Sequence, residues 1–396
     1  MVYERLDINV EFDDESLYEI IDECIHIMGK THMLSLFVRD ELRTRLYNAI
    51  KKLDILQELL EDDSITEIMV NGYKDIFIEK DGVVSRWNKT FESKEKLDDI
   101  AQRIAGMSNK TINEASPIVD TRLEDGSRVN IVLHPIALNG PIITIRKFYE
   151  TPLDINKLIS LGSITEEAAE FLKKLVTAKY NIFISGGTGC GKTTFLNVLS
   201  NYIPKDERII TIEDSAELQI KGVDNLVRLE ARTANTSGEN GVTIRDLIKS
   251  SLRMRPDRII VGEVRGCETI DMIQAMSSGH DGSLSTGHSN SPKDMLARLR
   301  TMILMGMDMP ADAIDRQIAS AIDIIVHIKR MRDKTRKVIE ITEVGEYEQG
   351  QITLTPLYKF LEEGEDSRGR VKGCLKKQKN SLANIDKMVS SGIKEW

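Results

Sequence analysis

Residues 181–203 read NIFISGGTGCGKTTFLNVLSNYI, and this stretch decides the fold of the C-terminal part of the chain. Within it, GGTGCGKT (186–193) fits the pattern GxxxxGK[ST], with Gly186, Gly191, Lys192 and Thr193 at the fixed positions. The apolar run before the pattern predicts a strand, and the residues after it predict a helix. A glycine-rich turn without a ligand is the alternative, but the strand and helix on either side favour a phosphate-binding P-loop.

The loop residues predict ATP and Mg²⁺ as cofactors. Glycines allow the backbone N–H groups to curl around phosphate oxygens. Lys192 is expected to reach the β- and γ-phosphates, and the Thr193 hydroxyl to bind Mg²⁺. Cys190 is expected to act only as a small residue. The predicted ATP-binding loop comprises Gly186, Gly187, Thr188, Gly189, Cys190, Gly191, Lys192, Thr193 and Thr194.

Strands and helices alternate along the chain from Asn181 onward, before and after this loop. The expected strands are NIFIS (181–185), RIITIED (208–214), RIIVGEV (258–264) and LSTGH (284–288). Apolar strands that alternate with helices predict an α/β fold with a mostly parallel sheet. Residues 322–360 return to strand-like patterns, with a turn near Asp333.

Two acidic residues end expected strands, Glu213 in RIITIEDSAEL (208–218) and Glu263 in RIIVGEVRG (258–266). Because sites in α/β proteins form at the carboxyl ends of strands, both should lie near the phosphates. A water that attacks a γ-phosphate needs an acceptor to orient it. Taken alone, each acid is more often a solvated loop residue; beside a P-loop, a catalytic role is favoured.

Two histidines lie in polar turns, His280 in SSGHDGS and His288 in STGHSNSP. No Cys or His partner has the spacing of a zinc site. A polar contact to phosphate or to Glu263 is expected for His288. A structural turn histidine is the alternative for both, and it weighs more for His280.

The rest of the chain predicts further domains. Apolar residues recur at helical spacing over 13–60, and from Ile65 the period changes to two, as in strands. The sequence therefore predicts an α+β domain before the ATPase domain. The expected boundaries are a helical N-terminal segment (1–53), an α+β domain (54–150), a linker (151–163), a RecA-like P-loop domain (164–362) and a charged tail (363–396).

Composition excludes several classes of protein. The chain has 396 residues, with 54 Lys plus Arg against 63 Asp plus Glu, a net charge of −9. Non-specific binding of nucleic acid needs a surplus of basic residues, so no direct nucleic-acid contact is expected. The acidic N-terminus lacks the apolar core of a secretory signal. The four cysteines show no CxxC pairing, so reduced cytosolic thiols are expected.

Four segments together resemble the signature boxes of the secretion-superfamily ATPases. They are GGTGCGKTT (186–194), TIEDSAEL (211–218), LRMRPDRIIVGEVRG (252–266) and SGHDGSLSTGHSNSP (278–292), matching the Walker A, aspartate, atypical Walker B and histidine boxes. The match is closest to the Tad/Flp pilus assembly ATPase of CpaF type. That group also accounts for ITEIMVNG (65–72), DGSRVN (125–130) and GPIITIRKF (140–148). The resemblance covers about residues 50–360.

The resemblance implies a homohexamer that binds ATP between its N-terminal and RecA-like domains. In such proteins Glu263 supports Mg²⁺ and hydrolysis, Glu213 orients the attacking water, and His288 approaches the γ-phosphate. The N-terminal domain supplies arginines, by motif position Arg128 and Arg146; a surface charge pair is the alternative for each. Further candidate arginines, which the sequence does not rank, are Arg228, Arg232, Arg253, Arg255 and Arg265.

The function implied is a cytoplasmic ATPase at the cytoplasmic face of the membrane that powers assembly, or retraction, of a Tad/Flp-type IV pilus. Its expected partners are inner-membrane platform proteins, through which it would associate peripherally with the membrane. A type IV secretion or conjugation ATPase that moves protein or DNA is the first alternative. A non-enzymatic ATP-binding scaffold and a RecA-like recombinase or helicase are the others. The set Lys192, Glu213, Glu263 and His288 argues against a scaffold.

Overall fold

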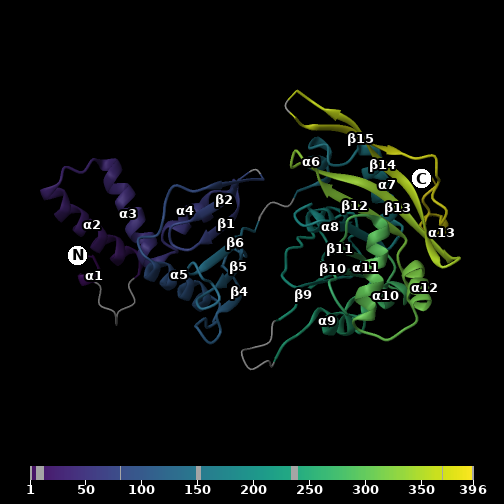
Figure 1. Ribbon diagram of the computed structural model, residues 1–396, viewed down its shortest axis with the longest axis horizontal. Helices are drawn as coiled ribbons and strands as arrows, with labels where there is room; N and C mark the ends of the chain where they lie inside the picture. Colours follow the sequence, from purple (N-terminus) through teal and green to yellow (C-terminus); the bar gives the residue numbers. More distant parts are fainter. Residues whose placement is uncertain are drawn as a thin grey trace. The chain divides into compact units, whose positions relative to one another are not determined.

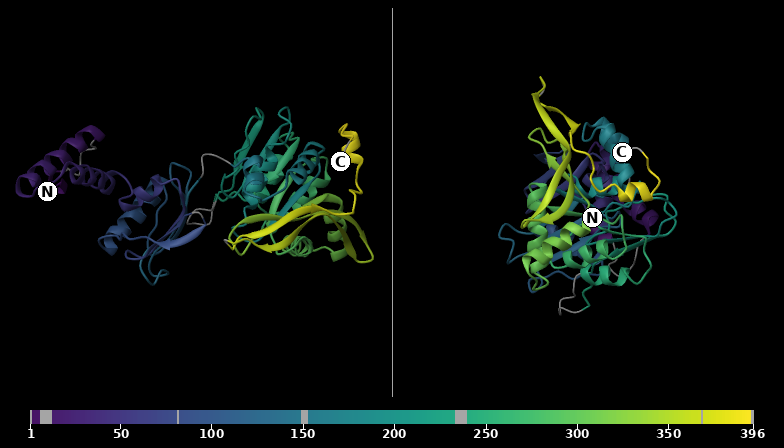
Figure 2. Two further views of the ribbon diagram at one scale, coloured as in Figure 1. Left: turned by 90° about the horizontal axis from the view of Figure 1, so that it is seen from above. Right: turned by 90° about the vertical axis from the view of Figure 1, so that its right-hand side faces the viewer.

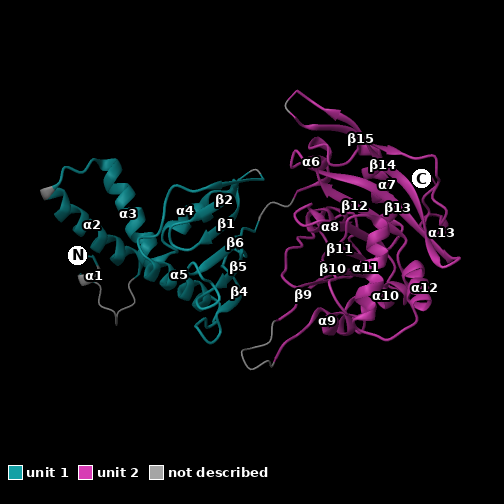
Figure 3. Ribbon diagram, in the orientation of Figure 1, with its two compact units in different colours: residues 1–149 teal, residues 150–396 magenta. Residues whose placement is uncertain are grey.

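The computed structural model describes residues 2–5, 13–80, 82–148, 153–232, 240–367 and 369–394. The chain divides into two compact units, residues 1–149 and 150–396 (Figure 3). Among the described residues, no helix is both long and apolar enough to cross a bilayer.

The first unit begins with a helical hairpin. Its elements are α1 (Val2–Arg5), α2 (Asp14–Thr31) and α3 (Leu36–Lys51). Asp13 caps α2 and Ser35 caps α3, each accepting a hydrogen bond from a backbone N–H three residues on. Leu17, Ile21 and Cys24 are buried at helical spacing on α2 and pack with apolar residues of α3. The hairpin therefore has a small core of its own.

A six-stranded antiparallel sheet follows. Its strands are β1 (Ile65–Asn71), β2 (Ile76–Lys80), β3 (Val83–Arg86), β4 (Ile118–Arg122), β5 (Arg128–Val132) and β6 (Ile142–Arg146), in the order β3-β2-β1-β6-β5-β4. One face packs on α4 (Ile55–Glu61) and α5 (Lys94–Met107) through residues such as Leu56, Ile100 and Ile145. This is the α+β architecture that the two-residue period predicts.

One expected helix is divided in two. The sequence pattern runs without interruption from Leu36 to Leu60, yet α3 ends at Lys51 and α4 begins at Ile55. Asp54 has a φ of +54°, which a continuous right-handed helix does not contain. Asp is one of the few residues with a side chain that adopts a positive φ readily.

The second unit contains the P-loop. Its helices are α6 (Ile155–Ser160), α7 (Glu166–Thr177), α8 (Lys192–Ser200), α9 (Ile244–Ser251), α10 (Thr269–Ser277), α11 (Pro292–Leu304), α12 (Ala311–Ala321) and α13 (Asp386–Ser390). Its strands are β7 (Ile182–Gly186), β8 (Ile209–Glu213), β9 (Leu226–Glu230), β10 (Arg258–Val261), β11 (Leu284–His288), β12 (Ile324–Arg330), β13 (Arg336–Glu348), β14 (Gln351–Glu365) and β15 (Val371–Lys377).

The strands form one sheet in the order β15-β14-β13-β12-β7-β11-β10-β8-β9 (Figure 1). Neighbours from β12 to β9 are parallel. Alternate residues of β7 enter two separate cores: Ile182 and Ile184 pack with α7 and α8, and Phe183 packs with α10 and α11. Helices thus cover both faces of the sheet, and the predicted α/β class is confirmed.

A buried ion pair ties the amino ends of the strands together. Arg258, at the start of β10, is fully buried and donates to both carboxylate oxygens of Glu207, at 2.5 and 3.0 Å. It also donates to the carbonyl oxygen of Val176. In this bidentate pair each charge is largely compensated by the other. Burial requires such compensation, because an unpaired buried charge is strongly destabilising.

The C-terminal segment differs from the expected charged tail (363–396). Residues 363–365 complete β14, and β15 pairs antiparallel with it. Beyond β15, Lys387 donates to Asp281 and Asp323, and Glu343 accepts from the backbone N–H groups of Ala383 and Asn384. Figure 2 shows this end of the chain, in yellow, lying against the second unit. The segment is therefore part of the ATPase unit.

Candidate nucleotide site

The P-loop joins the end of β7 to the start of α8, as the sequence predicts. Gly189 and Gly191 have φ values of +67° and +91°, which glycine adopts without strain. A Cβ atom at Gly186 would lie 2.3 Å from the carbonyl oxygen of Ile328. No side chain caps α8, so the N–H groups of its first turn can bind an anion. This cradle fits the phosphates of a nucleotide.

Lys192 lies folded over the loop that precedes it. Its Nζ donates to the carbonyl oxygens of Gly186 (3.3 Å) and Gly187 (3.0 Å), and lies 3.1 Å from Nδ1 of His288. The side chain is largely buried. The ammonium group is thus held at the mouth of the cradle, where a bound phosphate would be.

His288 connects Lys192 to Glu263. Strands β11 and β7 pair His288 with Gly186, which places the imidazole beside the P-loop. Because an ammonium group only donates, Nδ1 of His288 accepts and Nε2 carries the proton. Nε2 lies 2.9 Å from Oε1 of Glu263, a contact without hydrogen-bond alignment. Burial lowers the pKa of His288, and Glu263 opposes this effect, so the imidazole is neutral near pH 7.

Glu263 also pairs with an arginine. Arg265 donates from Nη2 to Oε2 of Glu263 at 2.8 Å, and its Nη1 lies 3.6 Å from Asp214. Asp214 belongs to the segment after β8, so Arg265 links the two acidic strand ends. The pKa of Arg265 is raised, chiefly by its hydrogen bond to Glu263. Of the five unranked arginines, Arg265 is the one that the structure places against a predicted catalytic residue.

Glu213 ends β8 and lies next to Gly262, the residue that precedes Glu263. A Cβ atom built at Gly262 would lie 3.0 Å from Cγ of Glu213, so a larger residue at position 262 would push the Glu213 side chain aside. Its Oε1 accepts from the backbone N–H groups of Glu217 (2.9 Å) and Leu218 (3.1 Å). Burial raises the pKa of Glu213 to about 7, against the effect of these hydrogen bonds. Near neutral pH this carboxyl group therefore changes its charge readily.

The protein oxygens fit a Mg²⁺ ion that arrives with its nucleotide. Such an ion is held by one or two protein groups, with phosphate oxygens and waters as its other ligands. Thr193, in the first turn of α8, and Glu263, two residues after β10, remain the predicted groups. Among the described residues, no cluster of three His, Cys, Asp or Glu could hold a metal by itself.

The structure adds Arg336, which sequence reasoning misses. Its Nε donates to the carbonyl oxygen of Gly189 at 3.0 Å, and its Cδ would be 3.4 Å from a Cβ at Gly191. It starts β13 and pairs with Arg330 at the end of β12, which also lies close to Gly189. Two arginines of the β12–β13 hairpin therefore flank the P-loop.

Replacing Arg336 by Ala should weaken ATP binding by roughly threefold to tenfold, because the loop loses a hydrogen bond from a charged donor. Titration with a fluorescent ATP analogue measures this change. Arg332→Ala is the matched control, since Arg332 lies on the same hairpin but pairs with Glu362 and Glu365. Equal affinity for Arg336→Ala and the wild type would contradict a role in holding the loop.

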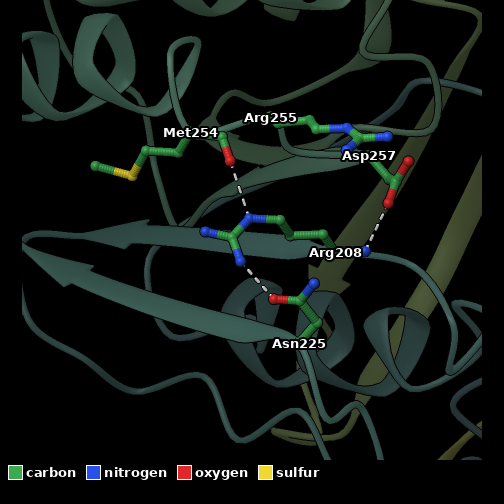
Figure 4. Close-up of a pocket in the computed structure, with 5 residues that line it drawn as sticks. All are labelled: Arg208, Asn225, Met254, Arg255 and Asp257. Carbon is green, nitrogen blue, oxygen red and sulfur yellow. Dashed lines mark hydrogen bonds between the residues drawn. The ribbon is translucent and has the colours of Figure 1, made fainter.

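Several candidates lie away from the P-loop. His280 precedes β11, at the opposite end of that strand from His288. Arg253 and Arg255 precede β10, also at the amino ends of the strands. A cavity of about 420 Å³ there is lined by Arg208, Asn225, Met254, Arg255 and Asp257 (Figure 4). Arg208 donates hydrogen bonds to the carbonyl oxygen of Met254 and to the side-chain oxygen of Asn225, so its guanidinium group is already paired within the protein. This cavity is not the nucleotide site.

Arg228 and Arg232 lie at the edge of the sheet. Arg228 is exposed on β9, and its charge opposes the rise in the pKa of Glu213 that burial causes. Arg232 follows β9 and donates to the carbonyl oxygen of Asn240. Arg128 and Arg146 belong to the first unit, where they are direct cross-strand neighbours on β5 and β6. Their contact with nucleotide stays a prediction.

Known proteins resemble this chain in sequence and in fold. A conjugal transfer protein of Mycobacterium tuberculosis is 34% identical over 300 residues, which cover 74% of this chain and 85% of that protein. The type IV secretion system protein VirB11 of Brucella abortus is 32% identical over 303 residues, covering 70% and 84%.

Solved structures share the fold. The pilus retraction motor PilT with bound ADP has a TM-score of 0.54 at 17% identity, covering 87% of this chain and 88% of that one. The ATPase DotB of Yersinia pseudotuberculosis has a TM-score of 0.55 at 18% identity, covering 74% and 78%. The family model described as type II/IV secretion system protein matches residues 49–384. The chain therefore belongs to the type II/IV secretion system protein family and is one of its ATPases.

Proposed function

We propose that this chain is the hexameric motor of a Tad/Flp-type IV pilus, in which ATP hydrolysis powers assembly, or retraction, through inner-membrane platform proteins at the cytoplasmic face. The observation that carries the proposal is the continuous contact from Lys192 through His288 to Glu263 at the P-loop. In this arrangement the imidazole of His288 lies between the phosphate-binding lysine and the carboxylate proposed to bind Mg²⁺, so the nucleotide state is linked to the ends of the strands. The motifs ITEIMVNG and GPIITIRKF support the pilus assignment.

Each residue of the site has a role in this proposal. Lys192 and the N–H groups of α8 would hold the phosphates, and Thr193 and Glu263 would hold Mg²⁺, which would neutralise charge on the phosphates. Glu213 orients the attacking water. His288 contacts Lys192 and Glu263 together, so a γ-phosphate that draws the ammonium group away would also alter Glu263.

The first unit would respond to the nucleotide through its arginines. Arg122, Arg128 and Arg146 are consecutive cross-strand neighbours, so they form one row on a single face of the sheet. The neighbouring row, Thr121, Val129 and Ile145, is buried on the opposite face. Guanidinium groups match phosphate geometry. In the proposed cycle, Arg128 and Arg146 draw the first unit onto ATP, and loss of the γ-phosphate releases it.

The proposed role of Glu213 makes hydrolysis depend on pH. Its raised pKa of about 7 means that the carboxyl group is mostly protonated below that pH, when it cannot accept a proton from water. The rate of hydrolysis at saturating Mg²⁺-ATP should therefore rise as the pH passes upward through about 7. Glu217 raises this pKa, so Glu217→Gln should move the midpoint of the profile to lower pH.

The Glu217→Gln shift separates Glu213 from the titration of ATP itself, which the variant does not alter. A rate profile without a midpoint near neutral pH, or an unchanged midpoint in Glu217→Gln, would count against Glu213 as the water-orienting base.

A type IV secretion or conjugation ATPase is the second candidate. The relatives described as a conjugal transfer protein and as VirB11 favour it. The net charge of −9 favours a protein cargo over direct contact with DNA. Deleting the gene in its host separates the two. Loss of surface pili supports the pilus motor, and loss of protein or DNA transfer with intact pili supports the second candidate.

The motor itself is tested with purified protein. Phosphate release is measured with Mg²⁺ and with excess chelator, and light scattering gives the mass with ADP and with ATP. Mg²⁺-dependent hydrolysis by an assembly of six copies supports the proposal. If the protein hydrolyses ATP and yet stays a monomer at every nucleotide concentration, the ring mechanism is contradicted.

A further inference from the structure

We propose that the turn of the α2–α3 hairpin inserts directly into an anionic lipid surface. The hairpin tip is defined here as residues 27–38, which comprise the last turn of α2, the connection and the first turn of α3. This contact would be made by the chain itself, in addition to any contact through platform proteins, and it does not depend on ATP hydrolysis.

The hairpin tip carries several large apolar side chains that are exposed among the described residues. Met33 is fully exposed at 106%, and Leu36 and Phe37 are 80% and 77% exposed. Ile27, Met28 and Val38 are also exposed, to lesser degrees. A single exposed apolar residue needs no explanation, but a contiguous group of this size marks an interaction site.

The hairpin does not need these residues in order to fold. Its core is formed nearer the other end of the two helices, where Leu17, Ile21 and Cys24 pack with α3. Tyr18 of α2 and Tyr47 of α3 stack there, with their ring centroids 4.5 Å apart. Helix α3 itself has no buried residue, so its first turn presents Leu36 and Phe37 outward. The apolar tip is therefore available for another surface.

The charges around the hairpin tip favour an anionic surface. Residues 26–39, HIMGKTHMLSLFVR, contain no Asp or Glu, although the chain as a whole has a net charge of −9. Lys30 lies in the last turn of α2, and the guanidinium group of Arg39 lies over Gly29, where a Cβ would be 3.1 Å from its Nη2. Two cations thus border the apolar group, and two acids just outside residues 26–39, Asp22 and Asp40, line the hollow beside Leu36 and Arg39. Apolar side chains framed by basic residues are the pattern of an interfacial membrane contact.

A lipid surface fits this arrangement better than a second copy of the chain. A second copy of this protein is acidic overall, so the two cations would be attracted to any acidic part of its surface rather than to one matching site. Anionic headgroups would attract Lys30 and Arg39, while Met33, Leu36 and Phe37 enter the boundary with the acyl chains. In an assembly of several copies, weak contacts of this kind add up, because the tips bind the same surface together.

The test is co-sedimentation of the full-length protein with vesicles. Binding to phosphatidylcholine vesicles that contain phosphatidylglycerol is compared with binding to phosphatidylcholine vesicles alone, for the wild type and for Phe37→Ala. The wild type should prefer the anionic vesicles and lose affinity as salt is added. Phe37→Ala should lower the apparent affinity by about tenfold, since burial of a large apolar side chain is worth a factor of this order.

Leu138→Ala is the matched control, because Leu138 is an equally exposed apolar residue (89%) of the same unit outside the hairpin. It should bind as the wild type does. Lys192→Ala should also bind normally, which separates this inference from the motor. Light scattering follows the mass of each variant. Unchanged vesicle binding by Phe37→Ala overturns the proposal, and a changed mass in the same variant would then identify the tip as a contact between copies.

Discussion

Lys192→Ala is expected to lower the rate of ATP hydrolysis by about 100-fold or more, because removing a preorganised group that stabilises transition-state charge commonly costs that much. Lys192 is the one side chain of the P-loop that contacts both the loop carbonyls and His288. Its removal therefore takes the positive charge from the phosphates and also frees the imidazole from its partner. Phosphate release at saturating Mg²⁺-ATP measures the effect.

The control for this variant addresses folding. Lys192 is largely buried, so its removal could disturb the loop. Lys173→Ala removes a lysine of α7 that pairs only weakly with Glu170 on the surface, and it should leave both the rate and thermal unfolding unchanged. Wild-type turnover by Lys192→Ala would show that ATP is hydrolysed elsewhere in the chain, and the site described here would be wrong.

The positions of the candidate site residues in the fold could be predicted from sequence where their geometry is local. The P-loop is a continuous segment whose glycines and lysine fix its shape. Glu213 and Glu263 follow apolar runs, so their positions at strand ends could be inferred from those runs, while His288 ends the short strand LSTGH in a polar turn. The contact between His288 and Glu263 required only that β11 and β10 be neighbours, which the structure shows them to be.

The residues that were missed depend on long-range pairing. Arg336 reaches Gly189 because the β12–β13 hairpin pairs it with Arg330 beside β7, and no local pattern marks that register. Strand β9 was not predicted because it is a half-exposed edge strand without a continuous apolar run.

The C-terminal segment was expected to be a tail because its composition is polar. In β15 only Val371 and Leu375 are buried, and the strand fits against its neighbour at Gly373, where a Cβ would be 2.4 Å from the carbonyl oxygen of Leu361. Charged residues and glycine are common on such edge strands. The polar composition of this segment therefore reflects the exposure of its side chains to solvent, and it does not mean that the segment lacks secondary structure.

Glu263→Gln is expected to slow hydrolysis strongly while leaving ATP binding nearly intact. The amide keeps the size of the side chain but removes the negative charge that would help to hold Mg²⁺, and it weakens the contacts with His288 and Arg265. A loss of about 100-fold in turnover is expected, since groups that act on charge in the transition state have effects of this order. Affinity for a fluorescent ATP analogue should change by less than about threefold, because Lys192 and the α8 N–H groups still hold the phosphates.

Asp214→Asn distinguishes this role from a merely structural one. Asp214 shares the partner Arg265 with Glu263 but lies 3.6 Å away and is half exposed, so the loss of its charge should alter turnover by less than about threefold. If both variants lose activity equally, the arginine that joins them is the important group, and Glu263 has no special part in hydrolysis. If Glu263→Gln alone fails, and higher Mg²⁺ partly restores its rate, then the carboxylate acts on the metal. The continuous contact from Lys192 to Glu263 then connects the phosphate to the metal side of the site, which is the connection that a motor driven by the γ-phosphate requires.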